Sequence, residues 1–144
     1  MKVEIRKEPF NPWNEIQIFQ EEMQKDGQFG AMACFVGSMR DFNESDKVTA
    51  MELEHYPGMT EKHLMDICNE ADNKWDIVNI LVLHRVGQID IADPIVLVSV
   101  WSAHRAQAFD ACRFIMEDLK SKAPFWKQET LAQGKRWVEK NTPG

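Results

Sequence analysis

The chain has 144 residues, 44% hydrophobic and 28% charged, which is the composition of a soluble globular protein with one domain over residues 1–144. No apolar run approaches the ~20 residues that span a bilayer, and the N-terminus lacks the apolar core of a signal peptide, so a cytoplasmic location is expected. The net charge of −6 is uneven, because residues 1–100 carry 9 basic and 18 acidic side chains and residues 101–144 carry 8 basic and 5 acidic. This balance argues against nucleic-acid binding and favours a local pocket for a small anion or an acidic chain end.

Hydrophobic periodicity predicts strands and helices in the order β-α-β-β-α-β-β-α, followed by short strands. The expected strands are residues 2–7, 30–40, 48–56, 77–86 and 94–101, and the expected helices are residues 12–26, 59–75 and 102–122. Helices that are interspersed with strand pairs indicate an α+β fold, with a mixed or antiparallel sheet and three main helices. The chain has no G-x-G-x-x-G motif or P-loop, so a doubly wound nucleotide fold is not expected.

The run G-A-M-A-C-F-V-G-S-M-R at 30–40 predicts a strand buried on both faces. Gly37 near its end permits a bend or a close backbone approach. Arg40 follows directly, where a cation is well placed to face a ligand. A surface arginine paired with Asp41 or Asp46 explains the same pattern.

The helix at 102–122 is expected to be the principal element of the chain. Ser102 is its predicted N-cap, and Pro124 should end it near Ser121 or Lys122. The predicted apolar stripe consists of Ala103, Ala106, Phe109, Cys112, Met116 and Leu119.

Cations flank this helix at both ends. His104 and Arg105 in its first turn oppose the helix dipole, which favours a bound anion, although solvated side chains are the ordinary alternative. Lys120, Lys122 and Lys127 form a second basic group, of which the two helical lysines also suit the dipole.

The two basic groups are too far apart to form one small site within a chain. His104 and Lys120 are separated by 16 residues, which is roughly 24 Å of helix at about 1.5 Å per residue. If both groups bind one substrate, a second copy of the chain must supply one of them. The length of the helix therefore predicts a site across a homodimer interface.

The cysteines and histidines do not form a recognisable metal or redox motif. Cys34, Cys68 and Cys112 are widely spaced and have apolar neighbours, so buried free thiols are expected, with a reactive sulfur-carrying cysteine as the alternative. His55 and His63 are interpreted as structural. No metal and no cofactor are predicted.

Five segments, in this order and spacing, resemble the catalytic (large) subunit of molybdopterin synthase. They are G-A-M-A-C-F-V-G-S-M-R at 30–40, L-E-H-Y-P-G-M at 53–59, H-R-V-G at 84–87, S-A-H-R at 102–105 and K-S-K-A-P-F-W-K-Q-E at 120–129. The resemblance covers nearly the whole chain and implies an α/β-hammerhead-like α+β fold. Trp101 departs from the pattern, because a smaller residue is expected before S-A-H-R.

The resemblance implies a sulfurtransferase that acts in molybdenum cofactor biosynthesis. A homodimer would form the centre of a heterotetramer, in which each end binds a small ubiquitin-like sulfur-carrier subunit. The carrier's C-terminal Gly-Gly thiocarboxylate would supply two sulfurs to cyclic pyranopterin monophosphate, forming the dithiolene of molybdopterin. No membrane or nucleic-acid partner is implied.

The family's pocket residues correspond to positions of this chain. Lys120 and Lys127 match the lysines implied to be catalytic, and we hypothesise acid/base catalysis by Lys120, with attack of its amine on the acyl group as the alternative. The implied substrate-binding residues are Ser38, Met39, Arg40, His104, Arg105, Gln128 and Glu129, of which His104 and Arg105 would come from the neighbouring subunit. The implied pocket wall consists of Phe35 and Met116.

Two other functions remain compatible with these residues. A non-catalytic dimeric module that binds an anion or a chain end would need only the basic groups. A cysteine-dependent sulfurtransferase would need one of the three thiols, although none has a nearby base in the sequence.

Overall fold

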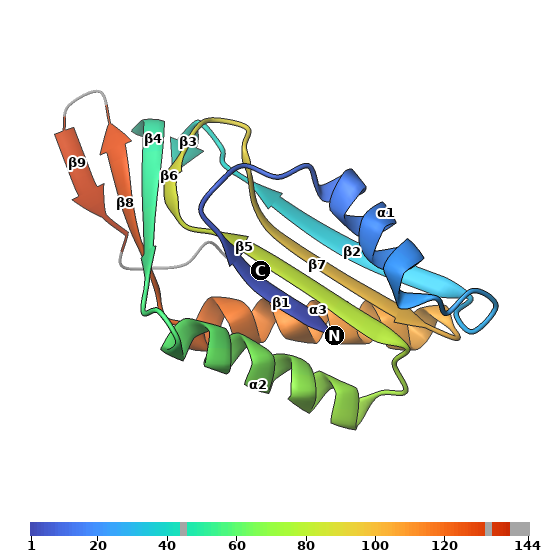
Figure 1. Cartoon of the computed structure of the whole chain (residues 1–144). Coiled ribbons are helices and arrows are strands. Elements are labelled where there is room, and N and C mark those ends of the chain that lie inside the picture. The colour runs from blue at the N-terminus through green and yellow to red at the C-terminus, as the bar shows by residue number, and fades with distance from the viewer. Residues whose placement is uncertain (44–45, 132–133, 139–144) are drawn as a thin grey trace.

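The computed structural model describes residues 1–43, 46–131 and 134–138, which fold into three helices and two sheets (Figure 1). The helices are α1 (Pro12–Met23), α2 (Met59–Lys74) and α3 (Arg105–Lys122). The strands are β1 (Lys2–Arg6), β2 (Ala31–Ser38), β3 (Phe42–Asn43), β4 (Asp46–His55), β5 (Asn79–Arg85), β6 (Gly87–Ile89), β7 (Pro94–Ser102), β8 (Phe125–Leu131) and β9 (Gly134–Trp137). The predicted α+β class with three main helices is confirmed.

The first sheet is mixed and has the strand order β1-β5-β7-β2. β1 pairs with β5 in parallel, whereas β5 with β7 and β7 with β2 are antiparallel. The second sheet has the order β3-β4-β8-β9, and β6 also pairs with β4. The two sheets lie end to end, and the chain passes between them several times, for example from β5 to β6 and from α3 to β8 (Figure 1).

Helices cover both faces of the first sheet, with α1 on one face and α2 and α3 on the other (Figure 1). Alternate side chains of its central strands therefore enter two separate cores. Ile80 and Val82 of β5 pack in the core under α2 and α3, whereas Leu81 and Leu83 pack in the core under α1. A third core, which includes Met51 and other residues of the second sheet, lies at the junction of the sheets.

β2 is an edge strand, so the prediction that it is buried on both faces was wrong. Met32, Cys34 and Phe35 are exposed, and β2 pairs with β7 on one side only. An unbroken apolar run is typical of a central strand, but an edge strand that another chain covers has the same pattern. The sequence alone does not distinguish the two.

Two predicted helix ends also need correction. α1 ends at Met23, with Gln24 in the left-handed region (φ 51°), rather than at Gly27. Ser102 is the last residue of β7, and its hydroxyl donates a hydrogen bond to the carbonyl of His104, which is the N-cap of α3. The pairing of β7 with β2 extends to Ser102 and delays the start of the helix.

The predicted apolar stripe of α3 is correct only in its second half. Cys112, Met116 and Leu119 are buried, whereas Phe109 is 65% exposed. The stripe that packs on the sheet consists of Ala108, Ala111, Cys112, Ile115, Met116 and Leu119. Phe109 thus presents a large apolar side chain to the surroundings.

Trp101 fills the core under α1, at a position where the resemblance predicted a smaller residue. Its side chain is fully buried, and its Nε1 donates a hydrogen bond to Oε1 of Gln20 over 2.9 Å. Phe19 meets its ring edge-on, with 5.4 Å between the ring centroids. The bulky side chain is accommodated because α1 supplies both an apolar and a polar partner.

Trp101→Ala is expected to lower the free energy of unfolding by about 3–5 kcal/mol, since it removes a fully buried ring and leaves the Gln20 amide without its partner. Urea unfolding followed by circular dichroism measures this change. Trp13→Ala is the matched control, because Trp13 is 62% exposed on α1. Equal losses in the two variants would contradict the packing of Trp101.

Candidate active site

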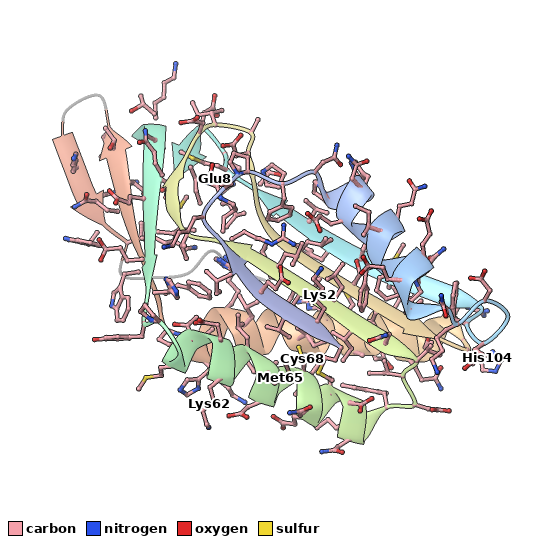
Figure 2. The ribbon with its side chains drawn as sticks, in the orientation of Figure 1. Lys2, Glu8, Lys62, Met65, Cys68 and His104 are labelled. Carbon is pink, nitrogen blue, oxygen red and sulfur yellow. The ribbon has the colours of Figure 1, made fainter. Side chains whose placement is uncertain are left out.

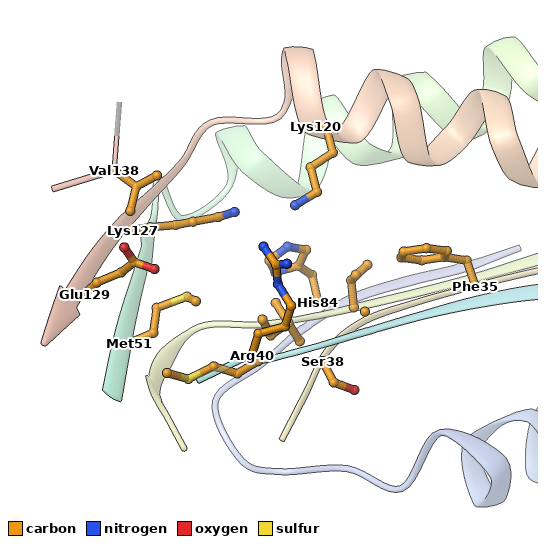
Figure 3. A pocket seen from close by; sticks show the side chains of 13 residues that line it. Phe35, Ser38, Arg40, Met51, His84, Lys120, Lys127, Glu129 and Val138 are labelled. Atoms are coloured by element: carbon orange, nitrogen blue, oxygen red, sulfur yellow. The ribbon is translucent and has the colours of Figure 1, made fainter. Parts of the chain in front are cut away.

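A pocket of about 220 Å³ lies where the two sheets meet (Figure 3). Its wall comes from the end of β2, from β4, β5, β7 and β8, from the last turn of α3, and from the residues that follow β2 and β9. The lining residues are Phe35, Gly37, Ser38, Met39, Arg40, Met51, His84, Ile95, Val96, Lys120, Lys127, Glu129 and Val138. Segments that are far apart in the sequence therefore share one cavity.

The end of β2 forms one wall of the pocket. The register with β7 shifts between Gly37 and Ser38, which turns the strand at this point. A Cβ added at Gly37 would lie 2.9 Å from Cγ1 of Val96, so a larger residue would crowd the wall. Met39 is buried beyond this irregularity, and its amide donates a hydrogen bond to the carbonyl of Asp93 over 2.9 Å.

Arg40 is exposed and lines the pocket, and its guanidinium points toward His84 and the lysines in Figure 3. Among the described side chains, no ion pair joins Arg40 to Asp41. The side chain of Asp46, the other predicted partner, lies outside the described part of the structure. Arg40 is thus positioned to meet an anion in the cavity.

Lys120 and Lys127 approach the pocket from different elements. Lys120 lies in the last turn of α3, which ends with Ala123 in an extended conformation before Pro124. The chain then enters β8, where side chains alternate between two faces. Lys127 and Glu129 share the pocket face, and the amino groups of Lys120 and Lys127 point into the same space in Figure 3.

Burial and the nearby charge of Lys120 lower the pKa of Lys127 from 10.5 to about 8. A hydrogen bond with Lys120 also contributes, and such a bond between two amines requires that one of them is neutral. The carboxylate of Glu129 opposes this shift. Glu129 is itself buried and accepts a hydrogen bond from Nε of Arg136 over 3.1 Å.

His84 is a pocket residue to which the sequence analysis gave no role. It lies near the end of β5, is 5% exposed and stacks on Phe125, with 3.8 Å between the ring centroids. Burial is the main cause that lowers the pKa of His84 from 6.5 to about 3, and the charges of Lys120 and Lys127 contribute to the same shift. The segment H-R-V-G at 84–87 is one of the five that carry the family resemblance, and it was the signal in the sequence that could have pointed to this histidine.

A second cavity of about 540 Å³ adjoins the pocket and shares His84, Lys120, Lys127 and Val138 with it. Its remaining lining residues are Leu119, Ser121, Ala123, Phe125, Trp126 and Trp137. Trp126 and Trp137 are 40% and 54% exposed, and Tyr56 meets Trp126 edge-on nearby. A cavity lined in part by aromatic side chains therefore adjoins the two lysines.

Most of the candidate residues lie in the pocket, but four do not. Ser38, Met39, Arg40, Lys120, Lys127, Glu129 and Phe35 line it. Met116 packs instead in the core under α3, and Gln128 points away because strand alternation places it opposite Lys127. His104 and Arg105 are exposed at the other end of α3, where His104 is labelled in Figure 2.

The three cysteines are free thiols, but the prediction that all are buried was wrong, because Cys34 is exposed on β2. Burial raises the pKa of Cys68 and Cys112 to about 12, which disfavours their thiolates. Burial also raises the pKa of Cys34. None of the three lines the pocket.

Comparison with known proteins assigns the chain to a family. A family model described as "MoaE protein" matches residues 5–122. A curated relative from Ralstonia nicotianae, named molybdopterin synthase catalytic subunit, is 57% identical over 112 residues, which are 78% of this chain and 64% of that protein. A relative of the same name from Pseudomonas aeruginosa is 45% identical over 139 residues, which are 96% of this chain and 91% of that protein. The chain belongs to the MoaE family of molybdopterin synthase catalytic subunits, which participate in molybdenum cofactor biosynthesis.

Solved structures share this fold. The MoaE protein of Burkholderia ambifaria is 41% identical and superposes with a TM-score of 0.81, covering 99% of this chain and 92% of that one. A structure described as the complex of subunits 1 and 2 of molybdopterin-converting factor from Helicobacter pylori has a TM-score of 0.79 at 20% identity, covering 97% of this chain and 92% of that one. In the described part of this chain, no helix has the length and apolar character needed to cross a membrane.

Lys127→Met is expected to stabilise the fold, since it removes a cation that folding crowds against Lys120. The pKa of Lys127 is lower in the folded chain than in the unfolded chain, so the unfolded chain takes up this proton first as the pH falls from 10.5 toward 8. Protonation therefore favours unfolding, and the whole loss of folding stability is present below pH 8. We expect a gain of about 3 kcal/mol at pH 7 that disappears above pH 10.5. Denaturant unfolding at both pH values measures it.

Lys122→Met is the control for this experiment, because Lys122 is exposed on α3 and its pKa is raised by its hydrogen bond to Asp118. It should show no gain in stability at either pH. A Lys127 variant that behaved like the Lys122 variant would contradict the crowding of the two pocket lysines.

Proposed function

We propose that this chain is a sulfurtransferase, which moves two sulfurs from the C-terminal thiocarboxylate of a small ubiquitin-like carrier to cyclic pyranopterin monophosphate and so forms the dithiolene of molybdopterin. The observation that carries the proposal is the pair Lys120 and Lys127 in one pocket, where the pKa of Lys127 is lowered to about 8. An amine of this pKa exchanges protons near neutral pH.

The two lysines suit the chemistry of acyl release. Once the sulfur has bonded to the substrate, the carrier is attached through a thioester, and water must attack its acyl carbon while the carbon–sulfur bond breaks. A neutral Lys127 accepts a proton from that water, and the Lys120 ammonium stabilises the oxyanion. This assignment moves the acid/base role from Lys120, where the sequence hypothesis put it, to Lys127, whose pKa is shifted.

The cyclic phosphate of the substrate needs cations, and Arg40 is one at the pocket mouth. His104 and Arg105 are too distant within one chain, since α3 separates them from Lys120 by roughly 24 Å at about 1.5 Å per residue. We therefore assign them to the site of a second copy. Phe109 on α3 and Phe35 on the edge strand β2 are both large, exposed apolar side chains, which suits them to this dimer contact.

The second cavity is the proposed entrance for the carrier's chain end. It joins the pocket at the two lysines and is lined by aromatic side chains, including Trp126 and Trp137. A Gly-Gly terminus has no side chains, so it could lie close to the aromatic rings that line this cavity. The Helicobacter pylori complex of subunits 1 and 2 supports a two-subunit enzyme for this fold.

The lowered pKa of Lys127 favours catalysis over simple anion binding. A module built to hold an anion gains from lysines that stay charged, whereas this pocket destabilises one ammonium by burial and by the charge of Lys120. The cysteine-dependent alternative loses support, because burial raises the pKa of all three thiols and none lines the pocket.

Lys120→Ala and Lys127→Ala are each expected to lower kcat by about 100- to 10,000-fold at saturating substrate, since each removes a group that acts on the transition state. The assay mixes the purified chain with thiocarboxylated carrier and cyclic pyranopterin monophosphate and measures dithiolene product. Lys122→Ala is the matched control on the same helix, and it should keep full turnover. Carrier binding without product in the wild-type chain would support the binding module instead.

Mixing two inactive variants tests the shared site. In the proposed dimer, each site takes Lys120 from one copy and Arg105 from the other copy. A dimer of one Arg105→Ala chain and one Lys120→Ala chain therefore has one site with both residues intact and one site that lacks both. Random reassociation of equal amounts should restore about a quarter of wild-type activity. Unmixed variants provide the baseline, and no recovery in verified mixed dimers would place Arg105 outside the neighbouring site.

A further inference from the structure

His84 lies in the proposed site, and the proposed acyl-release chemistry does not use it. It lines both the pocket and the aromatic entrance, and its ring is almost completely buried. The stack on Phe125 is nearly parallel, with 15° between the ring planes. Since His84 belongs to the first sheet and Phe125 begins β8 of the second, this stack connects the two sheets beside the lysines.

One hydrogen bond determines which nitrogen of His84 carries the proton. Nδ1 lies 2.7 Å from the backbone carbonyl oxygen of Arg85, and because a carbonyl only accepts, Nδ1 must donate. Burial keeps the ring neutral, with its pKa lowered to about 3. Nε2 is therefore left with a lone pair as the ring's only acceptor.

The groups around this acceptor are mostly cationic. Lys120 from α3 and Lys127 from β8 both act on His84, and so does His55 from β4. Arg40 points toward the ring from the residues that follow β2, and Glu129, on the same strand as Lys127, is the carboxylate that lines this pocket (Figure 3). A neutral acceptor among cations suits an ammonium donor, and Lys120 exerts the largest electrostatic effect on His84 of the three.

We propose that His84 is a positioning residue for sulfur transfer, whose Nε2 accepts an N–H bond from the Lys120 ammonium group while the stack on Phe125 holds the ring. This inference rests on the proposed function. Lys120 has a long flexible side chain, and aiming it at the acyl oxygen requires a fixed partner. His84 supplies this partner without adding a charge that would repel the lysines.

Three substitutions separate the functions of the ring. His84→Gln places an amide oxygen near the position of Nε2, His84→Asn places an amide nitrogen near Nδ1, and His84→Phe keeps only the stack. We expect the Gln variant to retain kcat within about fivefold, and the Asn and Phe variants to lose about 10- to 100-fold. The KM for the carrier should stay unchanged in all three.

The reconstituted assay with thiocarboxylated carrier measures these values, and thermal unfolding checks that each variant is folded. His63→Phe is the control, because His63 is exposed on α2. Full activity of a folded Phe variant would overturn the inference, and so would activity in Asn but not in Gln, which would make the Arg85 bond the important one. A wild-type chain without product would instead refute the proposed function.

Discussion

The two pocket lysines meet because α3 ends at Lys122 and the chain reverses into a strand within two residues. Pro124 cannot continue the helical hydrogen bonds, and Ala123 before it is extended. The hydroxyl of the buried Thr60 donates a hydrogen bond to the carbonyl of Pro124 over 3.0 Å, which ties the turn to the start of α2. Without this reversal, Lys127 would continue along a helix away from Lys120.

Crowding two like charges in a half-buried pocket opposes folding, and the rest of the structure supports it. Glu129 is placed beside Lys127 by strand alternation and is held by Arg136 of the neighbouring strand. His84 fills the space behind the lysines as a neutral ring and adds no third buried positive charge. The pocket thus combines amines with a low local dielectric, which is the condition under which an amine exchanges protons near neutral pH.

The sequence predicted much of the fold, because most elements follow local patterns. The helix cap at Asn11, the alternation of Met51 and Leu53 in β4, and the break at Pro124 all depend on near neighbours in the chain. The errors occurred where distant segments decide the outcome. Ser102 was assigned to a helix, yet pairing with Ala31 of β2 extends the strand through it. Phe109 was placed in the core, yet the sheet packs against a different stripe of α3.

The sequence by itself determined the α+β class, the basic character of the last third and the separation of its two cationic groups by one long helix. These follow from composition, periodicity and the fixed rise of a helix. Only the tertiary structure decided that Lys127 and Glu129 face the pocket while Gln128 does not, and that His84 lines the same pocket as the two lysines with its Nδ1 bonded to the Arg85 carbonyl. Such relations depend on the meeting of two sheets and on burial, and both are properties of packed segments that no local pattern encodes.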